Sequence, residues 1–242
     1  MSEPADDPET EPEAGTGAGN ADEDADADEA LAELCAALAP AHRRHTAVLA
    51  LWRLRAPLLM LGLDDTWGIH RTAVEHAFDA LLLSPGAAAR TDGAAGLAPL
   101  LTDPPEGEPE DTLAEFQLEV LAELSQWPPD ADPDAEHTER TLRLARDLSR
   151  HLDRLVEDSL WDHPAHRAHA HHLSTLPAGS PTGYHHARGL VVEAACHDLV
   201  TALPPGPDPL PATAAGRQAL ALCEAFAAEL TATLAWLKTQ GR

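Results

Sequence analysis

Histidines crowd the second half of the chain. Five of them lie within ten residues: His163, His166, His169, His171 and His172. Histidine is the commonest metal ligand among protein side chains, and its charge changes near neutral pH. The chemistry to consider first is therefore metal binding, followed by a response to pH. No spacing in the cluster matches a specific zinc-site or catalytic signature, so the cluster alone does not define a function.

A metal site can be built from two predicted helices. His166, His169 and His172 recur every three residues, which places them along one face of a helix. On the next predicted helix, His186, Glu193 and His197 lie at positions i, i+7 and i+11 and share a face, and Glu193 and His197 are the expected ligands. Antiparallel packing would bring these faces together, and three such ligands with an open fourth position are typical of catalytic zinc. The sequence therefore offers a divalent-metal site for a helical-bundle enzyme.

The histidines are also compatible with two roles that need no metal. Histidine-rich tracts are often a feature of composition, and these side chains would then be exposed on a short amphipathic helix. Their protonation near pH 6 to 6.5 would also change the local charge, as in a pH sensor. The predicted apolar faces are extensive enough to stabilise a domain without a structural metal. We therefore expect no obligatory cofactor, with a divalent metal as the alternative.

Other catalytic signatures are missing from the sequence. It contains no G-x-S-x-G nucleophile motif, no G-x-G-x-x-G and no Walker-type glycine loop. Its cysteines, Cys35, Cys196 and Cys223, are odd in number and widely spaced, so they suggest neither a disulfide framework nor a CxxC redox motif. Cys196 and His197 are neighbours, but they point about 100° apart on a helix. Nucleophilic and nucleotide-dependent catalysis are not expected, and no catalytic residue is identified.

The elements that must position these residues all have helical periodicity. Apolar side chains recur every three or four residues in the segments 31–38, 45–59, 67–81, 112–127, 134–160, 184–203 and 212–238. His163-Pro164 is expected to begin a further short helix that reaches Leu176. Pro57 should kink or divide its helix. The prediction is an all-α protein, a compact bundle of about six to seven helices without strands.

Composition divides the chain into a tail and one domain. Residues 1–29 contain twelve acidic residues and no Lys or Arg, which predicts a disordered acidic tail. Residues 30–242 are expected to form a single helical domain. Within it, residues 85–110 form a long Gly/Pro/Ala loop and residues 204–211 a Pro-rich linker before the last helix.

The charge of the chain limits its partners. The formal net charge is −25, and residues 31–242 alone contain 29 acidic against 16 basic residues. This balance argues against nucleic acid and anionic membranes and is compatible with a basic protein partner. No secretion signal is recognised at the N-terminus. The apolar run 46–63 contains Arg53, Arg55 and Pro57, so no membrane span is expected there, and the cytoplasm is the predicted location.

Four polar residues on apolar helix faces need partners. Arg53 and Arg55 must reach solvent or pair with carboxylates, and the aspartates at positions 64–65 are candidates. The functional alternative for this arginine pair is a clamp for an anion or a partner carboxylate. His45 and His70 are expected to be core histidines held by structural hydrogen bonds.

The order of segments resembles a known family. An apolar helix ending in arginine and followed by proline is found here as His45–Pro57, and an Ala/aliphatic helix follows at Arg71–Leu83. A long helix, Thr141–Val156, then leads to a His-Pro-Ala step at 163–165. These features resemble the YjaG-like family of uncharacterised all-helical bacterial proteins over roughly residues 31–176. The resemblance implies an all-helical fold, no assigned activity and no catalytic residues.

Together these observations favour a binding protein. We expect a non-enzymatic cytoplasmic protein, immunity- or adaptor-like, whose acidic surface binds a basic protein partner and neither nucleic acid nor membrane. The alternative is the metal-dependent enzyme built on the histidines described above. The sequence does not determine the oligomeric state.

Overall fold

The computed structural model describes seven stretches of the chain: residues 29–62, 69–83, 97, 112–128, 131–159, 183–206 and 208–239. These residues are helical or irregular, and no strand occurs among them, which confirms the predicted all-α fold. The predicted tail up to residue 28, most of the 85–110 loop and the predicted helix 163–176 lie outside the described residues. Leu97, the one described residue of that loop, is fully buried.

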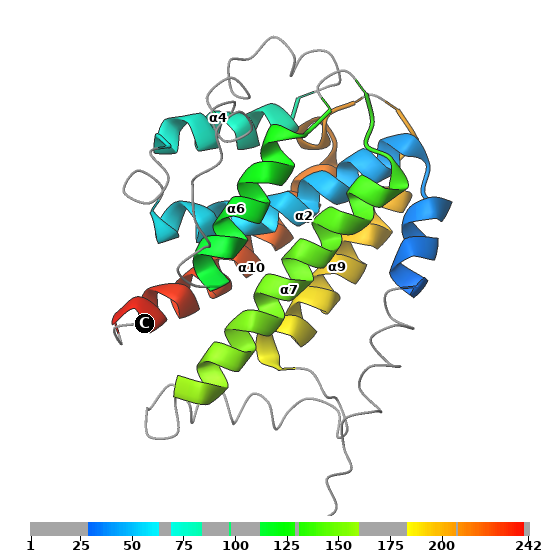
Figure 1. Cartoon of the computed structure of the whole chain (residues 1–242). Coiled ribbons are helices and arrows are strands. Elements are labelled where there is room, and N and C mark those ends of the chain that lie inside the picture. The colour runs from blue at the N-terminus through cyan, green and yellow to red at the C-terminus, as the bar shows by residue number, and fades with distance from the viewer. Residues whose placement is uncertain are drawn as a thin grey trace, which may run out of the picture.

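Six α-helices and a short 3₁₀ helix follow an initial helical segment at 29–37 (Figure 1). They are α2 (Pro40–Leu61), α4 (Arg71–Leu81), α6 (Thr112–Ser125), α7 (Ala135–Ser159), α9 (Tyr184–Thr201), η3 (Leu210–Ala212) and α10 (Ala214–Thr239). The bounds agree with the apolar periodicity to within a few residues, apart from α2, which begins earlier. The Pro-rich segment before α10 contains η3, whose Leu210 is buried.

Helix α2 is the centre of the bundle. It packs most extensively on α10, then on α7, and also against α9, α4 and α6. Its residues 44–54 are buried without a break, because the segment is apolar on all sides apart from a few polar residues. Helices α7 and α9 lie side by side across it (Figure 1). A polar side chain within residues 44–54 is therefore enclosed by neighbouring helices.

Pro57 does not divide α2. The helix continues through Pro57 to Leu61, although proline cannot donate the backbone hydrogen bond to the carbonyl of Arg53. It ends at Gly62, whose φ of 84° is a conformation that favours glycine. The Gly62 carbonyl accepts a 2.7 Å hydrogen bond from the Gln117 side chain of α6. Of the two effects predicted for Pro57, division of the helix does not occur, and a kink stays a prediction.

Two histidines of the second half are core residues. His185 and His186, in the first turn of α9, are both buried. Their backbone N–H groups donate to the two carboxylate oxygens of Asp153 on α7, at 2.8 and 2.9 Å. The His185 ring lies 3.0 Å from the hydroxyl of Thr233 on α10. These contacts join three helices and fix the position of α9.

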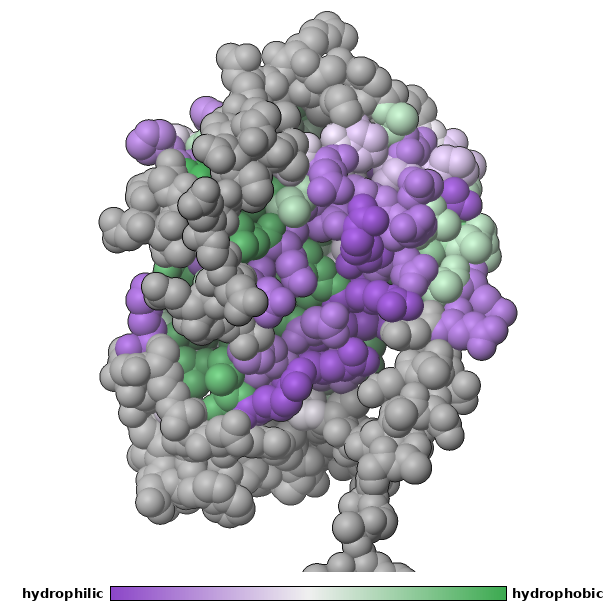
Figure 2. All heavy atoms as spheres, in the orientation of Figure 1, coloured by the Kyte–Doolittle hydropathy of each residue, from purple (hydrophilic) through white to green (hydrophobic). Residues whose placement is uncertain are grey.

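The surface and the core separate along the helices. Hydrophilic side chains cover the outward face of α7 (Figure 2). Helix α10 buries one side, including Cys223, Phe226, Leu230 and Leu234, against the bundle. By length and composition it is the one described helix apolar enough to cross a membrane, a test that core helices of globular proteins also pass. The cytoplasmic location stays a prediction.

Candidate functional site

A pocket of about 280 Å³ lies where α2, α7 and α9 meet. Its apolar lining consists mainly of four leucines, and its polar groups come from all three helices. The lining residues that carry the following argument are Thr46, Arg53, Arg146, Glu193, Cys196 and His197. A mainly apolar cavity with a few converging polar groups is the usual form of a small-molecule site.

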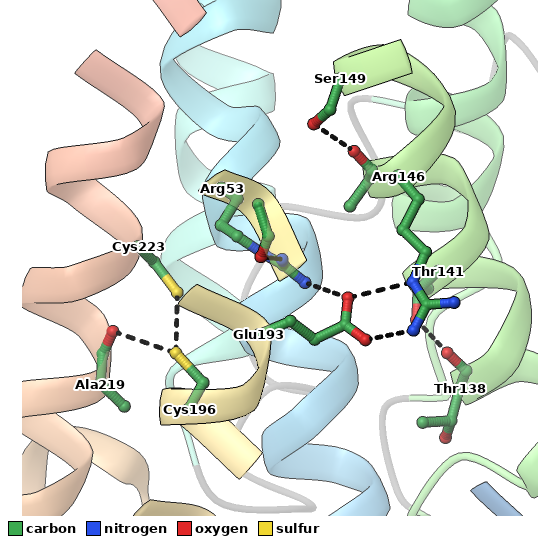
Figure 3. Close-up of polar contacts among 11 residues, drawn as sticks. Arg53, Thr138, Thr141, Arg146, Ser149, Glu193, Cys196, Ala219 and Cys223 are labelled. Atoms are coloured by element: carbon green, nitrogen blue, oxygen red, sulfur yellow. Dashed lines mark hydrogen bonds and ion pairs between the residues drawn. The ribbon is translucent and has the colours of Figure 1, made fainter. Parts of the chain in front are cut away.

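The Glu193 carboxylate is held between two guanidinium groups (Figure 3). Arg146 of α7 binds it in a bidentate manner, with N–O distances of 2.6 and 3.3 Å. Arg53 of α2 is farther away, with Nη2 at 3.7 Å from Oε2. Two cations thus share one anion, and this group of three carries a net positive charge within a chain of formal charge −25. Asp198 also lines the pocket, but its side chain is 87% exposed, so the excess positive charge belongs to the buried part of the lining. That buried part is suited to an additional anion.

Arg53 is buried but loosely bound. Only 4% of it is exposed, and its Nη1 donates a long 3.5 Å hydrogen bond to the Gly189 carbonyl. Its Nε has no hydrogen-bond partner among the described residues, and neither does Oγ1 of Thr46, which is 8% exposed. Both side chains line the same pocket. Buried polar atoms without partners are rare in native proteins, and a bound water, ion or ligand is one way in which they are satisfied.

The sequence of α2 places these two groups together. Thr46, Leu49 and Arg53 are spaced three and four residues apart, so they share one helical face. Gly189 brings α9 close to its neighbours, because a Cβ at that position would lie 3.2 Å from the Phe226 ring. The Gly189 carbonyl thereby comes within reach of Arg53.

Two thiols lie beside the arginine. Sγ of Cys196, on α9, is 3.6 Å from Sγ of Cys223, on α10, and 3.8 Å from the Ala219 carbonyl oxygen (Figure 3). Cys196 lines the pocket, whereas Cys223 is fully buried behind it. The hydrogen bond from Cys223 and the positive charge of Arg53 lower the pKa of Cys196. The hydrogen bond to Cys196 and burial raise the pKa of Cys223 well above its ordinary value.

The predicted metal ligands are distributed unevenly. Glu193 and His197 both line the pocket, whereas His166, His169 and His172 lie outside the described residues. Within the described stretches, no three His, Cys, Asp or Glu side chains form a group that could hold a metal ion. A metal on Glu193 would have to compete with its bidentate bond to Arg146. The metal site stays a prediction.

The arginines of α2 have partners other than the expected aspartates. Arg53 contacts Glu193, and Arg55 lies 3.9 Å from Asp79 of α4. Positions 64–65 lie outside the described residues. Arg55 also stacks over the Trp52 ring, with its guanidinium carbon 5.2 Å from the ring centroid. Arg53 therefore belongs to the pocket and Arg55 to the periphery.

A second pocket, of about 370 Å³, is lined by Arg44 and His45. Arg44 donates hydrogen bonds to the carbonyls of Leu83 and Ala131, each 3.2 Å long. The His45 ring lies 3.1 Å from the carbonyl oxygen of Asp208. These bonds hold connecting segments against α2, so the two side chains have a structural role. The prediction of a buried, hydrogen-bonded histidine is thus confirmed for His45.

The same prediction fails for the other histidine on an apolar face. His70 is the residue immediately before α4, and it is exposed. The first helical turn therefore leaves its ring outside the apolar face on which the sequence places it.

No sequence signal identifies Thr46 and Arg146 as pocket residues or Cys223 as the neighbour of Cys196. Their roles depend on which helices pack together, and each residue type is ordinary at its place in a helical pattern. Two cysteines 27 positions apart become neighbours only through the α9–α10 contact. A bidentate Arg146–Glu193 pair likewise requires the α7–α9 contact.

Comparison with known proteins adds no relative. No protein family matches the chain, and no curated protein or solved structure is significantly similar to it. The resemblance to the YjaG-like family stays a prediction. The function must therefore be inferred from the geometry of the pocket and the charge of the chain.

Proposed function

We propose that this protein is a non-enzymatic helical binding protein whose α2/α7/α9 pocket takes a small apolar molecule with a carboxylate group. The observation that supports the proposal most is a pair of buried polar atoms in one pocket, Nε of Arg53 and Oγ1 of Thr46, that have no partner among the described residues. A carboxylate would accept hydrogen bonds from both. Glu193 neutralises one of the two guanidinium charges of Arg53 and Arg146. The ligand carboxylate would neutralise the other.

The size and lining of the pocket limit the ligand. A volume of about 280 Å³ is close to the lower end of ligand sites. A water molecule takes roughly 30 Å³ of liquid, so the pocket has room for about nine groups of that size. Four leucines supply most of the apolar part of the lining, which favours an aliphatic or aromatic body on the ligand. A medium-chain carboxylate such as octanoate is a suitable probe.

Titration of the full-length protein with octanoate tests the proposal. We expect saturable binding by isothermal calorimetry and a rise in Tm, because a ligand that binds only the folded state stabilises it. Octan-1-ol is the matched control, since it has the same chain without the charge, and it should bind at least tenfold more weakly. If neither octanoate nor benzoate binds up to millimolar concentration, the proposed ligand class is wrong.

The variant Thr46→Val sharpens this test. Valine keeps the shape of threonine and removes a hydroxyl that has no partner in the described residues, so the free energy of unfolding should stay the same or rise. Octanoate affinity should fall about tenfold, the loss of one hydrogen bond to a charged group. Thr231→Val on α10, whose hydroxyl bonds to the Ala227 carbonyl, is the control and should leave affinity unchanged.

A second candidate function is the binding of a basic protein partner through an acidic surface. Glu115 and Glu119 of α6 and Asp147 of α7 line a groove of about 470 Å³ between these helices. Burial raises the pKa of Glu119, and the charges of Glu115 and Asp147 add to this effect. His151 and Arg154 also line the groove. A Lys or Arg side chain placed there would relieve the repulsion among the carboxylates.

A lysine-rich peptide distinguishes this second function from the first. We expect it to bind the wild-type protein with an affinity that falls as salt rises, and to bind Glu115→Gln/Glu119→Gln several-fold more weakly. Octanoate binding should be unchanged in that variant. An affinity independent of both salt and these two carboxylates would contradict a role for the α6–α7 groove.

A further inference from the structure

We propose that Cys196 and Cys223 form an oxidisable pair, which a hydroperoxide converts into a disulfide through initial reaction at Cys196. This inference goes beyond the binding function, because it assigns a modification site and a class of oxidant to residues that ligand binding does not require. It depends on the positions of three thiols relative to one pocket.

The two sulfurs are already neighbours. Their separation is 3.6 Å, and the side chains point toward each other from adjacent helices (Figure 3). A disulfide bond is about 2.05 Å long, so the sulfurs must approach by roughly 1.5 Å. Helices α9 and α10 are in extensive contact, and this places both cysteines on facing sides. Bond formation thus requires a local adjustment and no rearrangement of the bundle.

Access distinguishes the two members of the pair. Cys196 lines the α2/α7/α9 pocket, while Cys223 is fully buried and does not line it. A hydroperoxide is small enough to enter a space of about 280 Å³. It therefore meets the sulfur of Cys196 first, and Cys223 lies on the far side of that sulfur.

Charge also favours Cys196 as the reacting thiol. The thiolate is the nucleophile in such reactions, and positive neighbours stabilise it. The hydrogen bond from Cys223, together with Arg53, lowers the pKa of Cys196, whereas burial and Glu193 act in the opposite direction. The Cys223 thiol has its pKa raised and keeps its proton. The first proton of the pair is thus lost from Cys196.

The reaction proceeds in two balanced steps. The Cys196 thiolate attacks one peroxide oxygen, so an S–O bond forms while the O–O bond breaks. The departing alkoxide takes a proton and leaves as an alcohol, or as water from hydrogen peroxide. Cys223 then attacks the sulfenic sulfur of Cys196, the S–S bond forms, and the S–O bond breaks with release of water. The two thiols lose two electrons in total, and the peroxide gains them.

Cys35 is the built-in control. It is fully buried, and among the described residues it has no second thiol at hydrogen-bond distance. Burial first, and the negative charges of Glu139 and Glu193, raise the pKa of Cys35 to about 11. This thiol should therefore stay reduced under conditions that oxidise the pair.

The test is peroxide treatment of the native, full-length protein. After a few equivalents of hydrogen peroxide and a catalase quench, the protein is unfolded, alkylated with N-ethylmaleimide and mapped by mass spectrometry. We expect a loss of about 2 Da before alkylation, the mass of two hydrogens, with the Cys196 and Cys223 peptides linked and Cys35 alkylated. Dithiothreitol should reverse the change. Three alkylated thiols, or a disulfide that includes Cys35, would overturn the proposal.

Two variants separate the roles of the partners. In Cys223→Ser, the sulfenic acid has no thiol to react with, so dimedone should label Cys196 during peroxide treatment. In Cys196→Ser, dimedone labelling of Cys223 should be at least tenfold slower, because its thiol is buried and protonated. Equal labelling in the two variants would refute Cys196 as the reacting thiol. The wild-type mapping decides the main point even if either variant fails to fold.

Discussion

Glu193 is the residue on which the charge of the pocket depends. Its carboxylate accepts two hydrogen bonds from Arg146 and lies 3.7 Å from Arg53, and all three side chains are largely buried. Buried charges are costly unless they are paired, and removal of one partner leaves the others uncompensated. The same carboxylate therefore stabilises the junction of α2, α7 and α9 and limits the net positive charge that an anionic ligand meets.

Glu193→Gln is expected to destabilise the protein by roughly 3 kcal/mol, the usual effect of breaking a buried ion pair. Chemical denaturation followed by circular dichroism measures this loss. Glu136→Gln on α7 is the control, because its carboxylate is 87% exposed and lies 4.0 Å from Arg140. That variant should stay within about 0.5 kcal/mol of the wild type. Equal effects of the two substitutions would show that the buried pairing contributes nothing.

The same substitution should strengthen carboxylate binding. With Glu193 neutral, Arg53 and Arg146 present two positive charges to the pocket instead of one net charge. Octanoate should then bind several-fold more tightly to Glu193→Gln than to the wild type, although the variant is less stable. A weaker or unchanged affinity would argue that the ligand does not contact the guanidinium groups.

The sequence predicts which residues belong to the pocket better than it predicts what they do there. The apolar α2 sequence makes Arg53 conspicuous, and an anion clamp is one of the two roles that it suggests for this residue. Glu193 and His197 are correctly placed on neighbouring turns of one helix, but a metal site is only one use of them. The hydrogen bonds from Arg146 to Glu193 depend on how α7 packs against α9. The spacing of residues along either helix carries no information about that packing.

The element whose position matters most for the pocket is α9. The residue immediately before it is Gly183, which has no side chain to cap the exposed N–H groups. Asp153 of α7 takes that part and accepts hydrogen bonds from two successive backbone N–H groups. A negative charge at this end also interacts favourably with the helix dipole. One side chain of α7 thus fixes the start of the helix that carries Glu193 and Cys196.

Asp153→Asn should cost about 1–2 kcal/mol of unfolding free energy, because asparagine offers one acceptor oxygen in place of two and has no charge. Thermal and urea unfolding both measure the effect. Asp147→Asn lies on the same helix with 62% of its side chain exposed, and it serves as the control with little expected loss. Amide exchange in the first turn of α9 should also accelerate in Asp153→Asn and not in the control.

The first turn of α10 packs closely against the backbone of Leu210. The N–H of Gly216 donates to the hydroxyl of Thr213 at 2.9 Å, and a Cβ at position 216 would overlap the Leu210 carbonyl group. Gly216→Ala should therefore destabilise the protein by about 1–3 kcal/mol, although alanine is the better helix former by roughly 1 kcal/mol. Gln218→Ala, exposed on the next turn, should be neutral or slightly stabilising. Calorimetric Tm values compare the two.

Helix positions are the part of the fold that apolar periodicity predicts well. The segments at α6, α7, α9 and α10 agree with their expected ranges to within about three residues. The continuity of α2 through Pro57 has a physical cause. Neighbouring helices bury most of α2, Pro57 included, and this packing outweighs one lost backbone hydrogen bond. The Asp153 cap could not be predicted, because it comes from another helix.

Across the whole molecule, the negative charge is concentrated outside the described residues. The described stretches contain 20 acidic and 13 basic residues, a formal −7 out of −25. Many of the charges within them are paired, as in Arg143–Glu139 at 2.6 Å. The described helices thus present a mixed surface in which the α6–α7 groove is a local acidic site. A basic partner that bound this body would contact few unpaired carboxylates.

The pH dependence of stability depends on two buried histidines from different parts of the bundle. Burial lowers the pKa of His45 on α2 and of His137 on α7. The His45 ring bonds to the Asp208 carbonyl, and the His137 ring packs edge-on against Trp127 with centroids 5.5 Å apart. Their ordinary pKa is about 6.5 in the unfolded chain. Below that pH the unfolded state therefore binds protons that the folded state does not.

The sign of the effect follows from this difference. As pH falls through about 6.5, each such histidine lowers the free energy of unfolding by at most about 1.4 kcal/mol per pH unit. Glu119 acts in the opposite direction, because a carboxyl group whose pKa is raised favours the folded state at lower pH. Its window lies just above its ordinary pKa of about 4.5. Measurements between about pH 5.5 and 8 therefore report mainly on the histidines.

His45→Gln isolates one contribution. The glutamine amide can donate to the Asp208 carbonyl in place of the ring N–H but does not titrate, so the loss of stability between pH 7.5 and 5.5 should shrink relative to the wild type. His76→Gln is the control for loss of a histidine outside the core, because its side chain is exposed on α4. Urea denaturation at each pH gives the free energies. If His45→Gln and the wild type lose equal stability between pH 7.5 and 5.5, the lowered pKa of the buried His45 ring does not contribute to the pH dependence of the unfolding free energy.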